Sequence, residues 1–136
     1  MVRPIVRDPI FLSRKSVPAT AADRTVAADL RDTLAANADK CVGMAANMIG
    51  EARQIIVFLD GSTTTVMYNP VILRAEGEFE TEEGCLSLTG TRHTKRYSRI
   101  KVRYQDERFV RRVKDYTGWT AQIIQHEIDH CSGILI

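Results

Sequence analysis

The sequence predicts an α+β fold in which mixed or antiparallel sheets surround one central helix. Three observations predict it. Residues 20–38 and 117–131 carry apolar side chains at helical spacing. Residues 54–59 and 63–68 are short apolar or β-branched runs on either side of an Asp-Gly hairpin signal. From residue 99 to residue 104, basic side chains alternate with apolar ones, which is the period of a strand with one solvent-exposed face.

Length and composition are those of an ordinary globular protein. The 136 residues suffice for one domain, 1–136, with its own hydrophobic core. Hydrophobic residues make up 44% of the chain and charged residues 26%, as in soluble proteins generally. A net charge of +2 is too small to indicate a nucleic-acid partner or an acidic membrane. The three cysteines are unevenly spaced and do not suggest a disulfide framework.

The sequence shows no targeting or membrane segment. No apolar run follows the first arginines, so we expect no secretory signal. The longest unbroken apolar run, 55–59, is far too short to span a bilayer. We therefore expect a cytoplasmic protein, in a reducing compartment where Cys85 remains a thiol or thiolate.

The N-terminal part is expected to be an irregular arm followed by a helix. Three prolines within residues 1–19 predict the arm. Thr20, with Asp23 three residues later, is a variant of the capping box at the start of the helix over 20–38. Apolar residues along this helix predict a stripe that packs on a sheet.

Turn residues and periodicity assign the middle of the chain. Residues 41–50 are rich in Gly and Ala and are expected to form a loop. Asn69-Pro70 is expected to end the second strand of the first hairpin, and 71–80 should again be extended. The strand at 99–104 is expected to pair with 109–113 across a turn.

The last predicted helix carries the string Gln-His-Glu-Ile-Asp-His. Thr117 is expected to cap this helix and Gly133 to end it. His126 and His130 are four residues apart, so on a helix both imidazoles lie on one face and can bind one metal ion. Glu127 beside them is a candidate general base. On the motif alone, the two histidines could equally be surface residues of an amphipathic helix.

Cys85, within the string Glu-Gly-Cys-Leu-Ser, is a third candidate ligand. Two imidazoles and one thiolate leave a position for water, which is the arrangement of catalytic rather than structural zinc sites. A metal lowers the pKa of its bound water, and Glu127 can take and relay the proton to a leaving amine. Without its flanking residues, Cys85 would more often be a buried apolar thiol. We expect core packing for the other two cysteines, Cys41 and Cys131.

Three strings, in this order, resemble the motifs of the peptide deformylase family: Gly-Met-Ala-Ala at 43–46, Glu-Gly-Cys-Leu-Ser at 83–87 and Gln-His-Glu-Ile-Asp-His at 125–130. The resemblance covers most of the chain. It implies a metal-dependent hydrolase that removes the formyl group from N-formylmethionine at the N-terminus of new polypeptides. It implies a metal-binding central helix and one divalent ion, Fe²⁺ in the cell, with Zn²⁺ or Ni²⁺ also suited to these ligands.

The resemblance also assigns roles to individual residues. Cys85, His126 and His130 are the metal ligands, and Glu127 is general base and then general acid. Leu86 offers its backbone N–H to the oxygen that gains charge during the reaction. The residues expected to border the substrate are Gly43, Met44, Met48, Gly84, Arg92, Trp119, Gln122 and Ile123.

The charged residues near these motifs are expected to have structural roles or to face solvent. Glu83 is expected to contact a metal ligand, the alternative being a solvated carboxylate in an acidic run. His93 lies in a basic stretch that we expect to be a loop. Arg99, Lys101 and Arg103 are expected to form a solvated strand face rather than a nucleic-acid patch.

The first motif departs from the family pattern, which is usually Gly-apolar-Gly-apolar-Ala-Ala-x-Gln. Cys41 replaces the first glycine and Met48 replaces the glutamine. In the family, that glutamine amide donates to the forming oxyanion, whereas methionine has no donor. Losing one such donor lowers turnover by roughly 10²–10³-fold, so we expect a weakened enzyme. Asn47 could supply an amide instead only if the backbone were shifted.

Two lesser departures accompany this one. Thr89 stands where the family commonly has proline. The chain ends three residues after Gly133, so ribosome docking through a C-terminal helix, as in some deformylases, is not carried over. The expected partner is an N-formylmethionyl peptide, including nascent chains at the ribosome, with no nucleic acid and no membrane.

Two alternative functions remain open. One is hydrolysis of a different small N-acyl group, with Met48 marking a reshaped acyl pocket. The other is a non-catalytic, metal-binding relative, although such a protein would have no chemical need of Glu127. A general metalloprotease is disfavoured because thiolate ligation makes the metal a softer Lewis acid.

Overall fold

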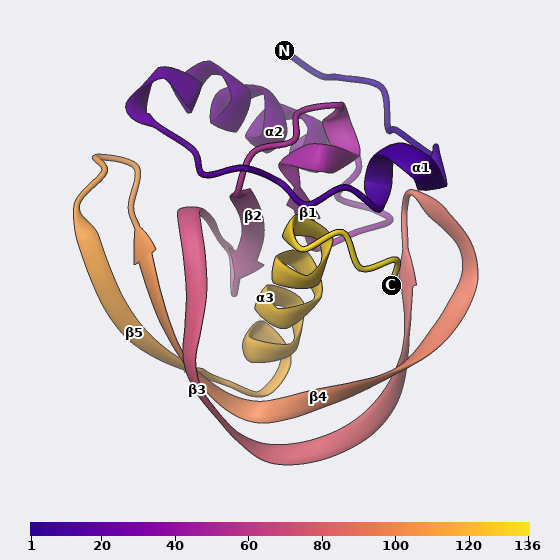
Figure 1. Ribbon diagram of the computed structural model, residues 1–136, viewed down its shortest axis with the longest axis vertical. Helices are drawn as coiled ribbons and strands as arrows, with labels where there is room; N and C mark the ends of the chain where they lie inside the picture. The colour runs from indigo at the N-terminus through magenta and orange to yellow at the C-terminus, as the bar shows by residue number, and fades with distance from the viewer.

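The computed structural model describes residues 1–136 and contains one antiparallel sheet with the strand order β1-β2-β3-β4-β5. The strands are β1 (Gly43–Ala45), β2 (Ile55–Asp60), β3 (Thr63–Cys85), β4 (Leu88–Gln105) and β5 (Arg111–Thr117). The helices are α1 (Pro9–Leu12), α2 (Arg24–Ala36) and α3 (Gly118–Cys131), with 3₁₀ turns η1 (Ala21–Asp23) and η2 (Ala46–Ile49). The predicted α+β fold around a central helix is confirmed (Figure 1).

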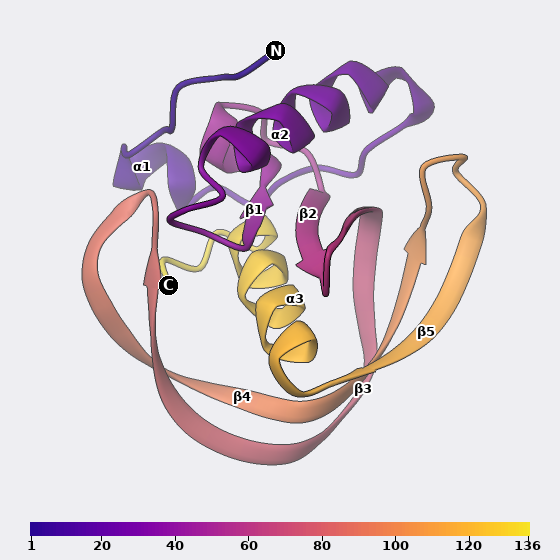
Figure 2. The ribbon, with the colours of Figure 1, turned by 180° about the vertical axis from the view of Figure 1, so that it is seen from behind.

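The long β3–β4 ribbon curves around α3 (Figures 1 and 2). The two strands pair from Tyr68 opposite Gln105 to Cys85 opposite Leu88. Three register shifts interrupt this ladder. Such irregularities bend a strand and increase its twist, which is how a flat ribbon comes to enclose a helix. The ribbon ends in a turn at residues 86–87, so Cys85, the last residue of β3, lies at the tip of the ribbon.

Strand β2 is buried on both faces because helices cover each side of it. Ile55 and Val57 belong to a core cluster that includes the apolar stripe of α2. Ile56 and Phe58 belong to a second cluster built on α3 and β4. Successive side chains of a strand point to opposite faces, so one continuous apolar run contributes side chains to both clusters. The predicted packing of the α2 stripe on the sheet is confirmed.

Helix α3 is fixed in rotation against the sheet by one buried side chain. The Gln125 amide oxygen accepts from the Tyr97 N–H of β4 at 2.9 Å, and its nitrogen donates to the Tyr97 carbonyl at 2.8 Å. The predicted limits of the helix are confirmed. Thr117 occupies the N-cap without a side-chain capping bond, and Gly133 ends the helix with a left-handed φ of 78°.

The N-terminal segment largely matches its prediction. The arm over 1–19 is irregular apart from the single turn of α1. The capping box is present: the Thr20 N–H donates to the Asp23 carboxylate at 2.8 Å, and the Thr20 hydroxyl accepts from the following turn. No helix in the structure is long and apolar enough to cross a bilayer.

Three local predictions are wrong. Residues 41–50 are not a loop, because they form β1 and η2. Asn69-Pro70 does not end a strand, because β3 continues through it with a register shift between Tyr68 and Val71. The shift accommodates a proline that cannot donate to the ladder and an Asn69 at a left-handed φ of 52°. His93 lies within β4 rather than in a loop.

The last strand lies slightly later than predicted. The partner of residues 99–104 is β5 at Arg111–Thr117, rather than 109–113. Phe109, predicted to be in this strand, instead has a left-handed φ of 61° and packs its ring on Tyr68. Aromatic contact with the core therefore overrides the strand propensity of this residue.

Candidate active site

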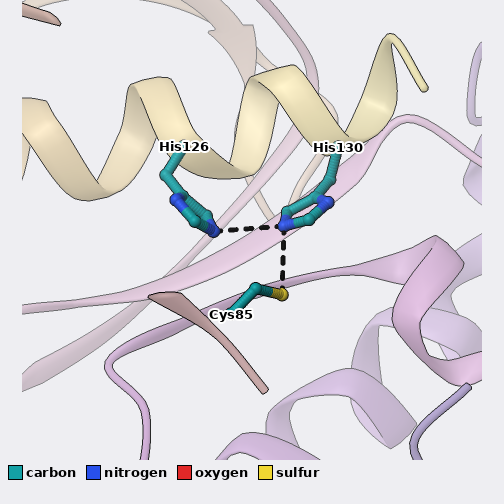
Figure 3. Close-up of side chains that lie close together, drawn as sticks. All are labelled: Cys85, His126 and His130. Atoms are coloured by element: carbon teal, nitrogen blue, oxygen red, sulfur yellow. Dashed lines mark hydrogen bonds between the residues drawn. The ribbon is translucent and has the colours of Figure 1, made fainter. Parts of the chain in front are cut away.

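Cys85, His126 and His130 meet at one point, at the tip of β3 and on one face of α3 (Figure 3). The Cys85 Sγ lies 3.3 Å from the His130 Nε2, which in turn lies 3.1 Å from the His126 Nε2. All three donor atoms lie within 4.8 Å of one another. The helix supplies the two imidazoles through its own spacing, and the β3–β4 ribbon supplies the sulfur.

These three donors fit a single metal ion. Ligands at about 2.0–2.3 Å from a tetrahedral ion lie roughly 3.3–3.6 Å apart, close to the separations seen here. The His126 Nδ1 lies 2.8 Å from the Glu83 Oε1, so its ring proton belongs on Nδ1 and its Nε2 lone pair faces the other donors. Burial, followed by nearby positive charge that includes Arg96, lowers the pKa of His130 to about 3 and keeps that ring neutral.

Glu83 contacts a candidate ligand, as expected, and is not a solvated carboxylate. It accepts hydrogen bonds from His126, from Arg96 at 2.7 Å and from Gln122 at 2.7 Å. Burial alone would raise the pKa of the Glu83 carboxyl, but these donors lower it to about 2. The carboxylate therefore stays ionised and holds the His126 ring in orientation.

Arg96 is a residue of the site that the sequence motifs do not identify. Its side chain is 4% exposed, and it joins the Glu83 carboxylate to Asp129 of α3, 2.7 Å from each. One signal could have found it. In a continuous strand, Arg96 shares its face with Ile100 and Val102, both of which are buried, whereas the neighbouring basic residues face solvent.

Replacing Arg96 by methionine is expected to destabilise the protein by about 3 kcal/mol, because it removes the only cationic side chain other than His126 that pairs with the buried Glu83 carboxylate, and the link from Glu83 to Asp129. The free energy of unfolding in urea measures this cost. Arg99→Met is a matched control on the same strand, since the Arg99–Asp115 pair is exposed and should contribute less than about 1 kcal/mol. Equal stability of the two variants would contradict a structural role for Arg96.

Glu127 is buried beside the three donors and directly against Gly43. A Cβ added at Gly43 would lie 2.9 Å from the Glu127 Oε2 and 2.8 Å from Ile123, so only glycine leaves room here. The Glu127 Oε1 has no hydrogen-bond partner within the protein. Burial raises the pKa of the Glu127 carboxyl to about 7. A carboxyl that titrates near neutral pH can both accept and return a proton.

A cleft of about 970 Å³ opens onto this group of residues. It reaches Cys85, His126 and Glu127, so small molecules have access to the candidate metal ligands. Among the residues predicted to border a substrate, those that line the cleft are Gly43, Met48, Gly84, Trp119, Gln122 and Ile123. Leu86 also lines it, and Trp119 is largely exposed at its edge.

Two predicted substrate residues lie elsewhere. Met44 is fully buried in the core, because along β1 it faces away from Gly43 and Ala45. Arg92 lies on β4 opposite Glu83 and is absent from the cleft lining. Cys41, predicted to pack in the core, is half-buried: it packs against the core cluster beside α2 and also lines the cleft. Cys131 is buried in the core as expected.

Met48 presents a thioether where the family motif has an amide. It lines the cleft, and its side chain offers no N–H to a charged oxygen. Asn47 does not replace that amide, because its Nδ2 donates to the His130 carbonyl at 3.0 Å from a fully buried position. Leu86 differs from both residues. Its backbone N–H makes no hydrogen bond within the protein, so this donor is free.

The family model for polypeptide deformylase matches residues 2–136. The chain belongs to the peptide deformylase family. A peptide deformylase of Clostridium beijerinckii is 54% identical over 136 residues, which covers the whole of both chains. The resemblance inferred from the three motifs is confirmed.

Solved deformylases share the fold over almost the full chain. The crystal structure of peptide deformylase from Thermus thermophilus matches with a TM-score of 0.87 and 38% identity, covering 98% of this chain and 83% of that one. The Met-Ala-Ser-bound class I type b peptide deformylase from Acinetobacter baumannii matches with a TM-score of 0.88 and 26% identity. That match covers 99% of this chain and 97% of the other.

Proposed function

We propose that this deformylase hydrolyses the formyl amide of N-formylmethionyl peptides, releasing formate and a free amino terminus. The observation that carries the proposal is the meeting of Cys85, His126 and His130 with the buried Glu127 at the end of an open cleft. Family membership supports it. The Acinetobacter baumannii relative binds Met-Ala-Ser, the peptide that remains after formyl-Met-Ala-Ser is deformylated.

In the proposed reaction, side-chain and backbone groups of the protein transfer the proton of the attacking water and stabilise the negative charge that develops on the substrate oxygen. A divalent ion held by Cys85, His126 and His130 would polarise the formyl oxygen and lower the pKa of bound water. Glu127 takes the proton of the attacking water and delivers it to the amide nitrogen as the C–N bond breaks. Leu86 directs its free N–H to the oxygen that becomes negative.

The residues that line the cleft would bind the peptide substrate. Ile123 and Trp119, one and two turns before His126 on α3, would contact the methionine side chain. Gly43 and Gly84 would allow the peptide backbone a close approach. Arg92, outside the lining, would meet only a longer peptide that extends past the cleft. Met48 would border the formyl group.

For the metal we propose ferrous iron. A thiolate and two imidazoles suit Fe²⁺, Zn²⁺ and Ni²⁺ alike, so the identity follows from family likeness rather than from the ligands. We further propose that the protein acts in the cytoplasm, on new polypeptides as they leave the ribosome, because these carry the formylmethionine that it would process.

Formate release from formyl-Met-Ala-Ser by anaerobically iron-loaded protein tests this function. We expect turnover that disappears after the metal is removed with a chelator and returns when iron is restored. Acetyl-Met-Ala-Ser should be a much poorer substrate. Absence of turnover with one metal ion bound per chain would overturn the proposal, and preferential hydrolysis of the acetyl peptide would indicate a different acyl group.

A further inference from the structure

The N-terminal arm reaches the proposed reaction site at two points. The Val6 N–H donates to the Met48 carbonyl at 2.8 Å, and the Arg7 Nη1 donates to the Leu86 carbonyl at 2.9 Å. Figures 1 and 2 both show the tip of the β3–β4 ribbon beside α1, where the arm passes. Arg7 itself lines the cleft. The arm therefore contacts both of the segments that border the forming oxyanion.

The peptide unit between Leu86 and Ser87 is held at both ends. Its carbonyl oxygen accepts from the Arg7 guanidinium, and its N–H, which belongs to Ser87, donates to the Cys85 Sγ at 3.4 Å. A cation on the carbonyl of an amide polarises that amide and strengthens its N–H as a donor. The same bond fixes the plane of the Leu86–Ser87 peptide and so restrains the adjoining Cys85–Leu86 peptide unit, which carries the free Leu86 N–H.

We propose that Arg7 is a positioning residue for the deformylation reaction. Through its bond to the Leu86 carbonyl, Arg7 orients the Leu86 N–H toward the substrate oxygen. The same bond strengthens the hydrogen bond from the Ser87 N–H to the Cys85 sulfur. The inference rests on the proposed function for its effect on turnover. Its effect on the sulfur is independent of turnover, because it concerns only the donor strength of the Cys85 thiolate.

No acidic side chain competes for Arg7. It takes part in none of the ion pairs of the protein, whereas Arg3 on the same arm is bound to Asp29 and Glu51. The arm thus has a separate anchor in Arg3, and the backbone bond of Val6 is independent of the Arg7 side chain. Removing that side chain should leave the arm in place while releasing the Leu86 carbonyl.

The test compares Arg7→Met with Arg14→Met. Arg14 is an exposed arginine of the same segment whose guanidinium lies 5.9 Å from the Phe11 ring. Each variant is loaded with Co²⁺, and the near-ultraviolet thiolate-to-cobalt charge-transfer band is recorded together with kcat and KM for formyl-Met-Ala-Ser. Thermal unfolding checks that both variants remain folded.

For Arg7→Met we expect kcat to fall about tenfold, the size typical of losing a partner that orients a metal ligand, with KM changed less than about twofold. The charge-transfer band should move to longer wavelength, because a sulfur with a weaker hydrogen bond is a stronger electron donor. Arg7→Lys, which restores a cationic donor, should recover part of both effects. Arg14→Met should match the wild type.

A wild-type band or a wild-type kcat in Arg7→Met would overturn the proposal, as would equal effects in Arg14→Met. If the wild-type protein releases no formate, the function proposed above fails. The band shift then still decides whether Arg7 acts on the Cys85 sulfur.

Discussion

Glu127→Gln is expected to lower kcat for formate release by about 10²–10⁴-fold while one metal ion per chain is retained. The amide fills the space of the carboxyl against Gly43, but it cannot take a proton from water or return one to the leaving nitrogen. Metal binding should not depend on residue 127, because the three candidate metal donors come from other residues. Metal content per chain and kcat, measured on the same sample, separate these two effects.

Glu80→Gln is the control for this change, since Glu80 is an exposed glutamate on β3 whose nearest ionic partner is His93 at 3.9 Å. It should behave as the wild type. If Glu127→Gln kept more than about a tenth of wild-type kcat, a different group would have to move the proton. If it lost the metal, the prediction that metal binding depends only on Cys85, His126 and His130 would be wrong.

Met48→Gln is expected to raise kcat for formate release by about 10²–10³-fold. Methionine and glutamine are unbranched and similar in length, so the new amide can occupy the same path into the cleft. The gain arises because the variant adds a donor where Met48 has none and where the Asn47 amide is already bound to the His130 carbonyl. Steady-state kinetics with formyl-Met-Ala-Ser measure it.

The same substitution should reduce stability, since Met48 is fully buried in the core cluster beside α2. Placing an amide there costs about 1–3 kcal/mol when no substrate oxygen accepts its hydrogen bond. The double variant Met48→Gln, Glu127→Gln is the control, and the gain should vanish in it. Unchanged kcat in the single variant would show that this deformylase does not depend on a donor at position 48.

Local sequence patterns predicted those features that depend on neighbouring residues. The spacing of His126 and His130 places both rings on one face wherever that helix forms, because helix geometry is local. The capping box at Thr20 and the Gly133 helix end are likewise local. The Glu-Gly-Cys-Leu-Ser string identified Cys85 only through family resemblance, since nothing in its own spacing connects it to a helix some 40 residues later.

Packing overrode the local signals elsewhere. Asn69-Pro70 is a strand breaker in isolation, yet β3 continues through it. The Asn69 side chain accepts from the Ala19 N–H at 2.7 Å and donates to the Gln105 side chain at 2.7 Å, which secures the irregular backbone from both sides. Residues 69–70, whose sequence predicts a turn, therefore form a bulge within β3, because tertiary hydrogen bonds satisfy the polar groups of Asn69.

The sequence by itself determined the family, the central helix with its two histidines, and the absence of an amide donor at Met48, because each of these follows from residue type and local spacing. Only the tertiary structure decided that Arg96 joins Glu83 to Asp129 and that Arg7 reaches the Leu86 carbonyl. These contacts link residues far apart in the chain. They depend on the curvature and register of the β3–β4 ribbon around α3, which core packing sets and no local pattern encodes.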